Sequence, residues 1–166
     1  MGSDPATDHA IWLEQIRRSG IRVDREGRFI HEGAEVTHEG LRRALFRWLD
    51  REPDGRHVLR LDARRFAYLD VDDTPLVARA ARIDPAAGAV YLALSDGSEA
   101  WLDPATLTVD GAGVLRAGVR GGRLEARLAS SAAAALADLI SEEDGCPVLH
   151  LGGRTHPIPT RPPAGG

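Results

Sequence analysis

Turn signals between residues 76 and 128 constrain the fold more than any other feature of this sequence. Asp-Pro, Asp-Gly and Gly-Gly pairs recur there at roughly 8–12-residue intervals and separate short apolar runs. The runs are 77–83, 89–94, 99–102, 107–109, 114–119 and 124–128. This spacing predicts an antiparallel meander that rolls up. It disfavours parallel βαβ units, which need a helix between successive strands.

A helix and four short strands are predicted upstream, over residues 20–75. The apolar residues of the helix recur at the spacing of one helix face: Leu41, Ala44, Leu45, Trp48 and Leu49. Thr37 is the expected N-cap, and the Pro and Gly at 53–55 end the helix. A hairpin is predicted over 21–31, and two strands over 57–61 and 65–71.

The remaining segments complete an α+β fold. Residues 1–19 are expected to form a leader and a short helix that runs from Asp8 to Gly20. The sequence predicts an N-terminal α/β roll over 20–75, then a mainly antiparallel β roll over 76–158. The second roll carries one late helix at about 130–142, and residues 159–166 are expected to be a disordered tail.

Two segments of the chain resemble one another. Residues 54–61 read DGRHVLRL and residues 144–151 read DGCPVLHL, and a predicted helix precedes each of them. One interpretation is an internal duplication of a β-β-α-β-β unit. The other is chance similarity in a chain rich in Leu and Gly.

Composition excludes several kinds of site. All 21 basic residues are Arg, and neither Lys nor Asn is present, so a Schiff-base Lys, a P-loop Lys and a Cys-His-Asn triad are impossible. The net charge of −4 argues against a nucleic-acid or anionic-membrane partner. No apolar run approaches membrane-spanning length. Cys146 is the single cysteine, so a reducing cytoplasm is the expected location. No cofactor is expected.

The turn at 70–76 is the main acidic candidate site. Asp70, Asp72 and Asp73 could supply oxygen ligands to a cation, or act in acid-base chemistry with His38 or His57. Their spacing fits no known calcium loop, and a solvated turn with Asx caps explains them better. A metal site is therefore not predicted.

Two further groups of residues are candidate binding sites. Cys146 and His150 lie about 13 Å apart on an extended strand, too far for one metal ion. Arg43 and Arg47 form part of a basic ridge on the central helix that could bind an anion or an acidic partner. Acidic residues three and four positions away also fit a solvated, self-paired helix face.

The sequence resembles the bacterial domain-of-unknown-function 1285 family. The resemblance rests on Gly27–Thr37, on the Arg-Glu-Pro-Asp-Gly run at 51–55, and on Val-Asp-Asp-Thr-Pro-Leu at 71–76. Weaker matches follow at 124–127 and 152–158. Leu76 stands where the family prefers Phe. The resemblance implies an N-terminal α+β roll followed by a mainly β roll. It implies no reaction, substrate or catalytic residue.

Together, these features favour a non-catalytic ligand- or protein-binding accessory module over an enzyme. We expect a binding groove near the 72–76 turn, where an unknown small molecule or protein would bind. The candidate ligand-binding residues are Asp72, Asp73, Pro75, Arg43 and Arg47. One alternative is a metal-dependent or acid-base hydrolase-like enzyme using Asp70, Asp72 and Asp73. The other is an oligomeric structural subunit.

Overall fold

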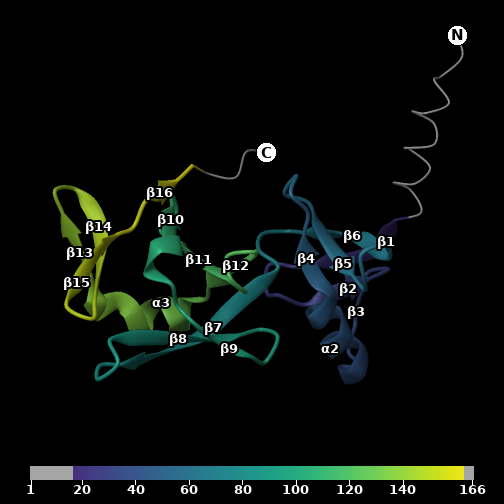
Figure 1. The fold of residues 1–166 in the computed structure, drawn as a ribbon, viewed down its shortest axis with the longest axis horizontal. Helices are drawn as coiled ribbons and strands as arrows, with labels where there is room; N and C mark the ends of the chain where they lie inside the picture. The colour runs from purple at the N-terminus through teal and green to yellow at the C-terminus, as the bar shows by residue number, and fades with distance from the viewer. Residues whose placement is uncertain (1–16, 163–166) are drawn as a thin grey trace, which may run out of the picture. The chain divides into compact units, whose positions relative to one another are not determined.

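A computed structural model describes residues 17–162, and the chain forms two compact units, Met1–Asp73 and Thr74–Gly166 (Figure 1). The α+β class expected from the sequence is confirmed, because strands predominate in both units and each contains a helix. The short helix expected over residues 8–20 lies mostly outside the described residues. Its last three positions, 18–20, belong to a strand instead.

Unit 1 is built on a six-stranded sheet with the order β3-β2-β1-β6-β5-β4. Its strands are β1 (Arg18–Val23), β2 (Phe29–His31), β3 (Ala34–Glu35), β4 (Leu49–Arg51), β5 (His57–Arg60) and β6 (Phe66–Val71). The predicted hairpin is confirmed, since β1 and β2 pair antiparallel with Val23 opposite Phe29. The pairing of β1 with β6 is parallel, and it brings the start and the end of the unit together.

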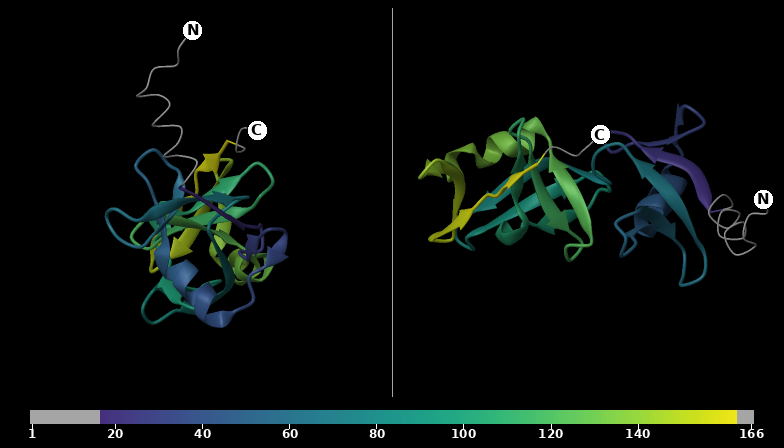
Figure 2. Two further views of the ribbon diagram at one scale, coloured as in Figure 1. Left: turned by 90° about the vertical axis from the view of Figure 1, so that its right-hand side faces the viewer. Right: turned by 90° about the horizontal axis from the view of Figure 1, so that it is seen from above.

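Helix α2 (Glu39–Trp48) packs its apolar face against this sheet (Figure 2). Phe46 meets Phe29 of β2 edge to face, with ring centroids 4.7 Å apart, and both rings are buried. The N-cap is His38 and not Thr37, because His38 Nδ1 accepts a hydrogen bond from the Leu41 amide at 3.1 Å. The helix thus begins one residue later than Thr37 capping would allow.

Aspartates at the first position of turns in unit 1 accept hydrogen bonds from nearby arginines. Asp62, between β5 and β6, accepts hydrogen bonds from the amides of Arg64 and Arg65 at 2.9 and 2.8 Å. Its second oxygen accepts from Arg65 Nε at 2.6 Å. The Arg64 amide, then the Arg65 side chain and amide, favour the charged carboxylate and lower the pKa of Asp62 to about 2.

This low pKa predicts acid-dependent loosening of the β5–β6 turn. The stabilisation is fully present above the unfolded pKa of about 4, and it is lost as the pH falls toward 2. We expect a carbon-13 NMR titration of the Asp62 carboxyl group to show a midpoint near 2, absent in Asp62→Asn. A midpoint at the ordinary value of 3.8 would contradict this hydrogen-bonded turn.

Unit 2 contains a seven-stranded sheet with the order β16-β10-β11-β12-β7-β8-β9 and a separate three-stranded sheet, β13-β14-β15. The strands are β7 (Leu76–Asp84), β8 (Ala89–Leu94), β9 (Glu99–Trp101), β10 (Thr108–Asp110), β11 (Leu115–Val119), β12 (Leu124–Leu128), β13 (Ile140–Glu143), β14 (Cys146–Leu151), β15 (Arg154–Pro157) and β16 (Thr160–Arg161). A 3-10 turn, η1 (Pro104–Thr106), precedes β10.

The antiparallel meander expected for the large sheet is only partly correct. Most neighbours pair antiparallel, but β7 pairs parallel with β12 and β10 pairs parallel with β16. The β7–β12 pairing joins the first strand of the unit to one about 50 residues later. Local turn signals cannot predict such a non-local pairing.

The late helix is shorter than predicted. α3 spans Ser130–Leu136 and continues as the 3-10 turn η2 (Ala137–Leu139), after which Ile140 begins β13. The residues expected to end the helix, 140–142, instead pair with β14. α3 packs against β7 and β12 (Figure 2). Within the expected tail, Thr160–Arg161 form β16, which pairs with β10, and residues 163–166 lie outside the described residues.

The two similar segments share one order of elements. α2, β4, a turn and β5 follow one another in unit 1, and α3, β13, a turn and β14 do so in unit 2. Both strand pairs are antiparallel. The turn is tighter in unit 2, where Glu143 lies opposite Cys146, than in unit 1, where Arg51 lies opposite His57. Similar sequence thus accompanies similar local structure.

Two turns of unit 2 cross in close backbone contact. A Cβ atom added at Gly88, in the β7–β8 turn, would lie 2.7 Å from the Cα atom of Gly152, in the β14–β15 turn. Both glycines have positive φ angles, +60° and +61°. The two sheets of the unit therefore meet at a crossing where a side chain at Gly88 would clash with the backbone of Gly152.

No helix within the described residues is long and apolar enough to cross a membrane.

Candidate functional site

Hydrogen bonds and an ion pair hold the acidic turn after β6 on either side of residue 73. Asp72 forms an ion pair with Arg22 of β1 at 2.5 Å, and its amide donates to the Val23 carbonyl. Thr74 is 2% exposed, and its hydroxyl donates to the Leu76 carbonyl and accepts from the Arg127 amide. Pro75 is buried. Asp72 and Pro75 thus have structural contacts that explain them, and ligand binding by Asp72, Asp73 and Pro75 remains a prediction.

The predicted basic ridge is not continuous on α2. Arg43 is paired with Glu39, as the i,i+4 spacing indicates. Arg47 has no such partner within the described residues, because Asp50 turns to Arg60 of β5 at 3.0 Å instead. Arg51, four residues after Arg47, belongs to β4 and not to the helix. Arg43 and Arg47 are exposed but line no described cleft, and their binding role is untested.

The hydrolase-like arrangement of Asp70, Asp72 and Asp73 does not come together as a metal centre. Across residues 17–162, no group of three or more His, Cys, Asp or Glu side chains is placed to hold a metal ion. The Nδ1 atom of His38 is engaged as the cap of α2. Asp72 is engaged by Arg22. Asp70 lines a cleft.

That cleft lies in unit 1, where β1 departs from regular pairing with β6. Arg18 lies opposite Tyr68 and Arg22 lies opposite Asp70, so four steps along β1 match two steps along β6. A bulge over residues 19–21 absorbs the difference, with Gly20 at a φ of +70°. Bulges of this kind bend a strand and redirect its side chains, often beside functional sites.

Ser19 fixes the bulge from inside the sheet. Its hydroxyl donates to the Tyr68 carbonyl at 2.7 Å and accepts from the Ile21 amide at 3.1 Å. These bonds replace ladder bonds that the bulge removes. The result is a cleft of about 440 Å³ lined by Arg18, Gly20, Ile21, Arg56, Tyr68 and Asp70.

Both signs of charge line this cleft. Neither Arg18 nor Asp70 makes a side-chain ion pair or hydrogen bond anywhere in residues 17–162. Arg56 is held in place, since its guanidinium stacks on the Tyr68 ring at 4.1 Å and its Nε atom donates to Asp54 at 2.8 Å. The Arg56 amide and then its side chain, by hydrogen bonding, lower the pKa of Asp54 and keep it charged.

Sequence reasoning missed most of this site. The sequence predicts Asp70 as a candidate metal or acid-base group, but no sequence pattern indicates Arg18, Arg56 or Tyr68. The available signal was Gly20, which we interpreted as the end of a helix. A glycine with positive φ ends a helix or forms a bulge equally well, so the residue alone does not distinguish them.

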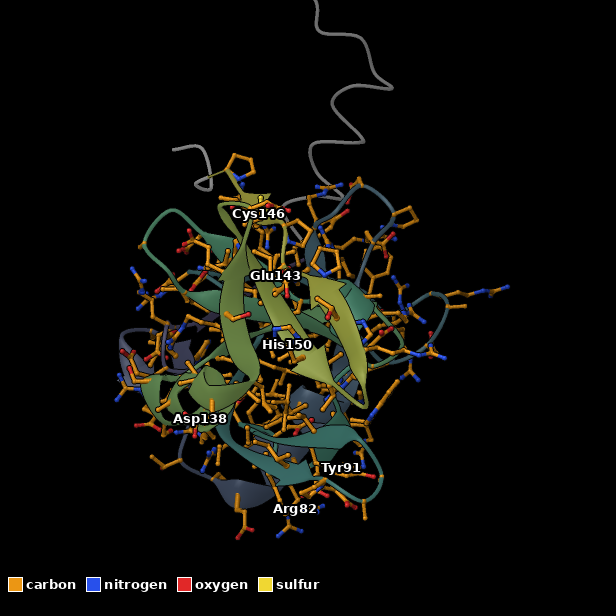
Figure 3. The ribbon with its side chains drawn as sticks, turned by 90° about the vertical axis from the view of Figure 1, so that its left-hand side faces the viewer. Arg82, Tyr91, Asp138, Glu143, Cys146 and His150 are labelled. Carbon is orange, nitrogen blue, oxygen red and sulfur yellow. The ribbon has the colours of Figure 1, made fainter. Side chains whose placement is uncertain are left out.

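A second cleft, of about 540 Å³, lies in unit 2 beside the Gly88–Gly152 crossing, and His150 is one of its lining residues. His150, Glu143 and Cys146 lie on the outward face of the three-stranded sheet (Figure 3). The Ser141 hydroxyl lies 2.7 Å from His150 Nε2, and the Thr155 hydroxyl lies 3.2 Å from Nδ1. Both ring nitrogens are thus satisfied by neighbouring strands.

This protein has an α+β fold of two units, each with a mixed sheet. The first unit has a charged cleft at a strand bulge. The fold matches that of DUF1285 family proteins from bacteria. The protein from Silicibacter pomeroyi DSS-3 has a TM-score of 0.71 and 23% identity, covering 85% of this chain and 80% of that one. The protein from Shewanella baltica OS155 has a TM-score of 0.56 and 12% identity, covering 67% and 84%.

These likenesses confirm the fold that the sequence resemblance implied. At such identities they show the fold alone. No protein-family model and no curated protein matches the sequence.

Proposed function

We propose that this protein is a non-catalytic ligand-binding module whose site is the bulge cleft of unit 1. The proposed ligand is a small molecule bearing a carboxylate. The observation that carries the proposal is the Arg18 guanidinium, which has no side-chain partner within residues 17–162, in one cleft with the stacked Arg56–Tyr68 pair. The proposed site includes Asp70, two residues before the 72–76 turn favoured by the sequence.

The chemistry of the lining supports binding of a carboxylate. A guanidinium presents a planar fork of donors that matches a carboxylate in two-point geometry. Arg18 has those donors available, and Asp54 and Tyr68 restrain Arg56 before any ligand arrives. Restraint of this kind reduces the entropy lost on binding. Ile21 and the Tyr68 ring add an apolar wall.

We expect small carboxylates to perturb the amides of β1 and β6 in nitrogen-15 NMR titrations. Benzoate and L-leucine are suitable probes, because one supplies a ring and the other an aliphatic chain. Replacing Arg18→Gln should lower the affinity for the probe at least tenfold, which corresponds to about 1.4 kcal/mol of binding free energy. The fold should stay unchanged, since Arg18 is exposed.

Arg64→Gln is the matched control for this experiment. Arg64 is also an exposed arginine of unit 1 with no side-chain partner in the described part of the chain, and it lines no described cleft. Its replacement makes the same change of charge and should leave affinity unaltered. The proposal fails if neither probe perturbs β1 and β6, or if both variants weaken binding equally.

A further inference from the structure

We infer that the ligand of the bulge cleft is a zwitterion, a free α-amino acid with an apolar side chain. This inference rests on the proposed function and names the class of ligand. It starts from Asp70, a carboxylate that lines the same cleft as Arg18 and has no ion-pair partner within the described residues.

The strand register separates the two opposite charges. Arg18 is level with Tyr68, whereas Asp70 stands two residues further along β6. Two residues of a strand span about 6.6 Å and return to the same face of the sheet. Arg18 and Asp70 therefore face one cleft and form no ion pair with each other.

The dimensions of an α-amino acid suit this separation. Its ammonium nitrogen and carboxyl carbon are two bonds apart, about 2.5 Å. With a charge-assisted hydrogen bond of about 2.8 Å at each end, such a ligand can bridge two opposite charges that are too far apart to pair directly. The carboxylate would lie on Arg18 and the ammonium on Asp70.

Charge complementarity favours a zwitterion over a ligand that carries only one of the two charges. A ligand with a carboxylate alone would leave Asp70 uncompensated and would be repelled by it. A ligand with an ammonium group alone would be repelled by Arg18 and Arg56. The remaining lining, Ile21 and the Tyr68 ring, is apolar or aromatic and favours an apolar side chain on the amino acid.

Three matched probes test this inference by calorimetry on the full chain. L-leucine carries both charges, L-leucinamide lacks the carboxylate, and 4-methylpentanoate lacks the ammonium group. We expect L-leucine to bind at least tenfold more tightly than either analogue. In Asp70→Asn, the preference for L-leucine over 4-methylpentanoate should disappear, and in Arg18→Gln the preference over L-leucinamide should disappear.

The outcomes separate this inference from the proposed function. If 4-methylpentanoate binds as tightly as L-leucine, the cleft takes carboxylates and the zwitterion is wrong. If Asp70→Asn keeps the full preference for L-leucine, Asp70 does not hold the ammonium group and the inference is overturned. If no probe perturbs β1 and β6, the proposed function itself fails. Unchanged amide spectra elsewhere in unit 1 confirm that both variants are folded.

Discussion

Replacing Gly88→Ala is expected to destabilise unit 2 by about 2–5 kcal/mol. The added Cβ atom would lie 2.7 Å from the Gly152 Cα atom, a backbone atom that cannot rotate away. Overpacking of this kind costs about 1–3 kcal/mol. The φ angle of +60° adds about 1–2 kcal/mol, because L-residues with a side chain are strained there. Hydrogen exchange of β8 and β14 amides measures the loss.

Gly97→Ala separates the two contributions. Gly97 lies in the β8–β9 turn with a φ of +83°, and no atom lies within 4 Å of its added Cβ. Only the backbone strain should remain, at about 1–2 kcal/mol. If the two variants lose equal stability, the close crossing at Gly88 and Gly152 contributes nothing beyond strain. If Gly88→Ala is clearly worse, the crossing fixes how the two sheets of unit 2 meet.

Regular elements with local periodicity were predictable from the sequence. The apolar spacing around Leu45 predicted α2, and the turn pairs predicted most strands of unit 2 within one or two residues. Both signals depend only on neighbours along the chain. The capping residue was missed, because Thr37 and His38 each offer an acceptor and the final geometry selects one.

Non-local pairings were not predictable in the same way. The Ala-rich run after Ser130 contains no residue that stops a helix, yet Ile140 leaves the helix to pair with Leu149 of β14. The parallel pairing of β7 and β12 joins segments that share no local signal. In both places, the energy of tertiary contacts outweighs a local preference.

The bulge cleft was missed for a related reason. Its residues come from β1, from the β4–β5 turn and from β6, and only the sheet brings them together. Many arginines of this chain are engaged by aspartates, as in Asp24–Arg28, Asp54–Arg56, Asp62–Arg65, Asp96–Arg120 and Asp110–Arg116. Against that pattern, it is informative that Arg18 and Asp70 lie in one cleft and have no side-chain partner in the described part of the chain, whereas the abundance of Arg is not informative.

Replacing Phe46→Ala is expected to destabilise unit 1 by about 3–5 kcal/mol, the usual cost of truncating a buried aromatic side chain. Phe46 is 6% exposed and meets the buried Phe29 ring edge to face, so the substitution leaves a cavity between α2 and β2. The free energy of unfolding, followed through exchange of β2 and β5 amides, measures this loss.

Leu41→Ala provides the control on the same helix. Leu41 is 43% exposed, so its truncation removes little buried surface, and Ala has a high helix propensity. A change below about 1 kcal/mol is expected. Should the two variants lose similar stability, α2 would contribute to unit 1 through helix formation and not through its packing against the sheet. A much larger loss in Phe46→Ala would instead show that the Phe29–Phe46 contact holds the helix on the sheet that carries the bulge cleft.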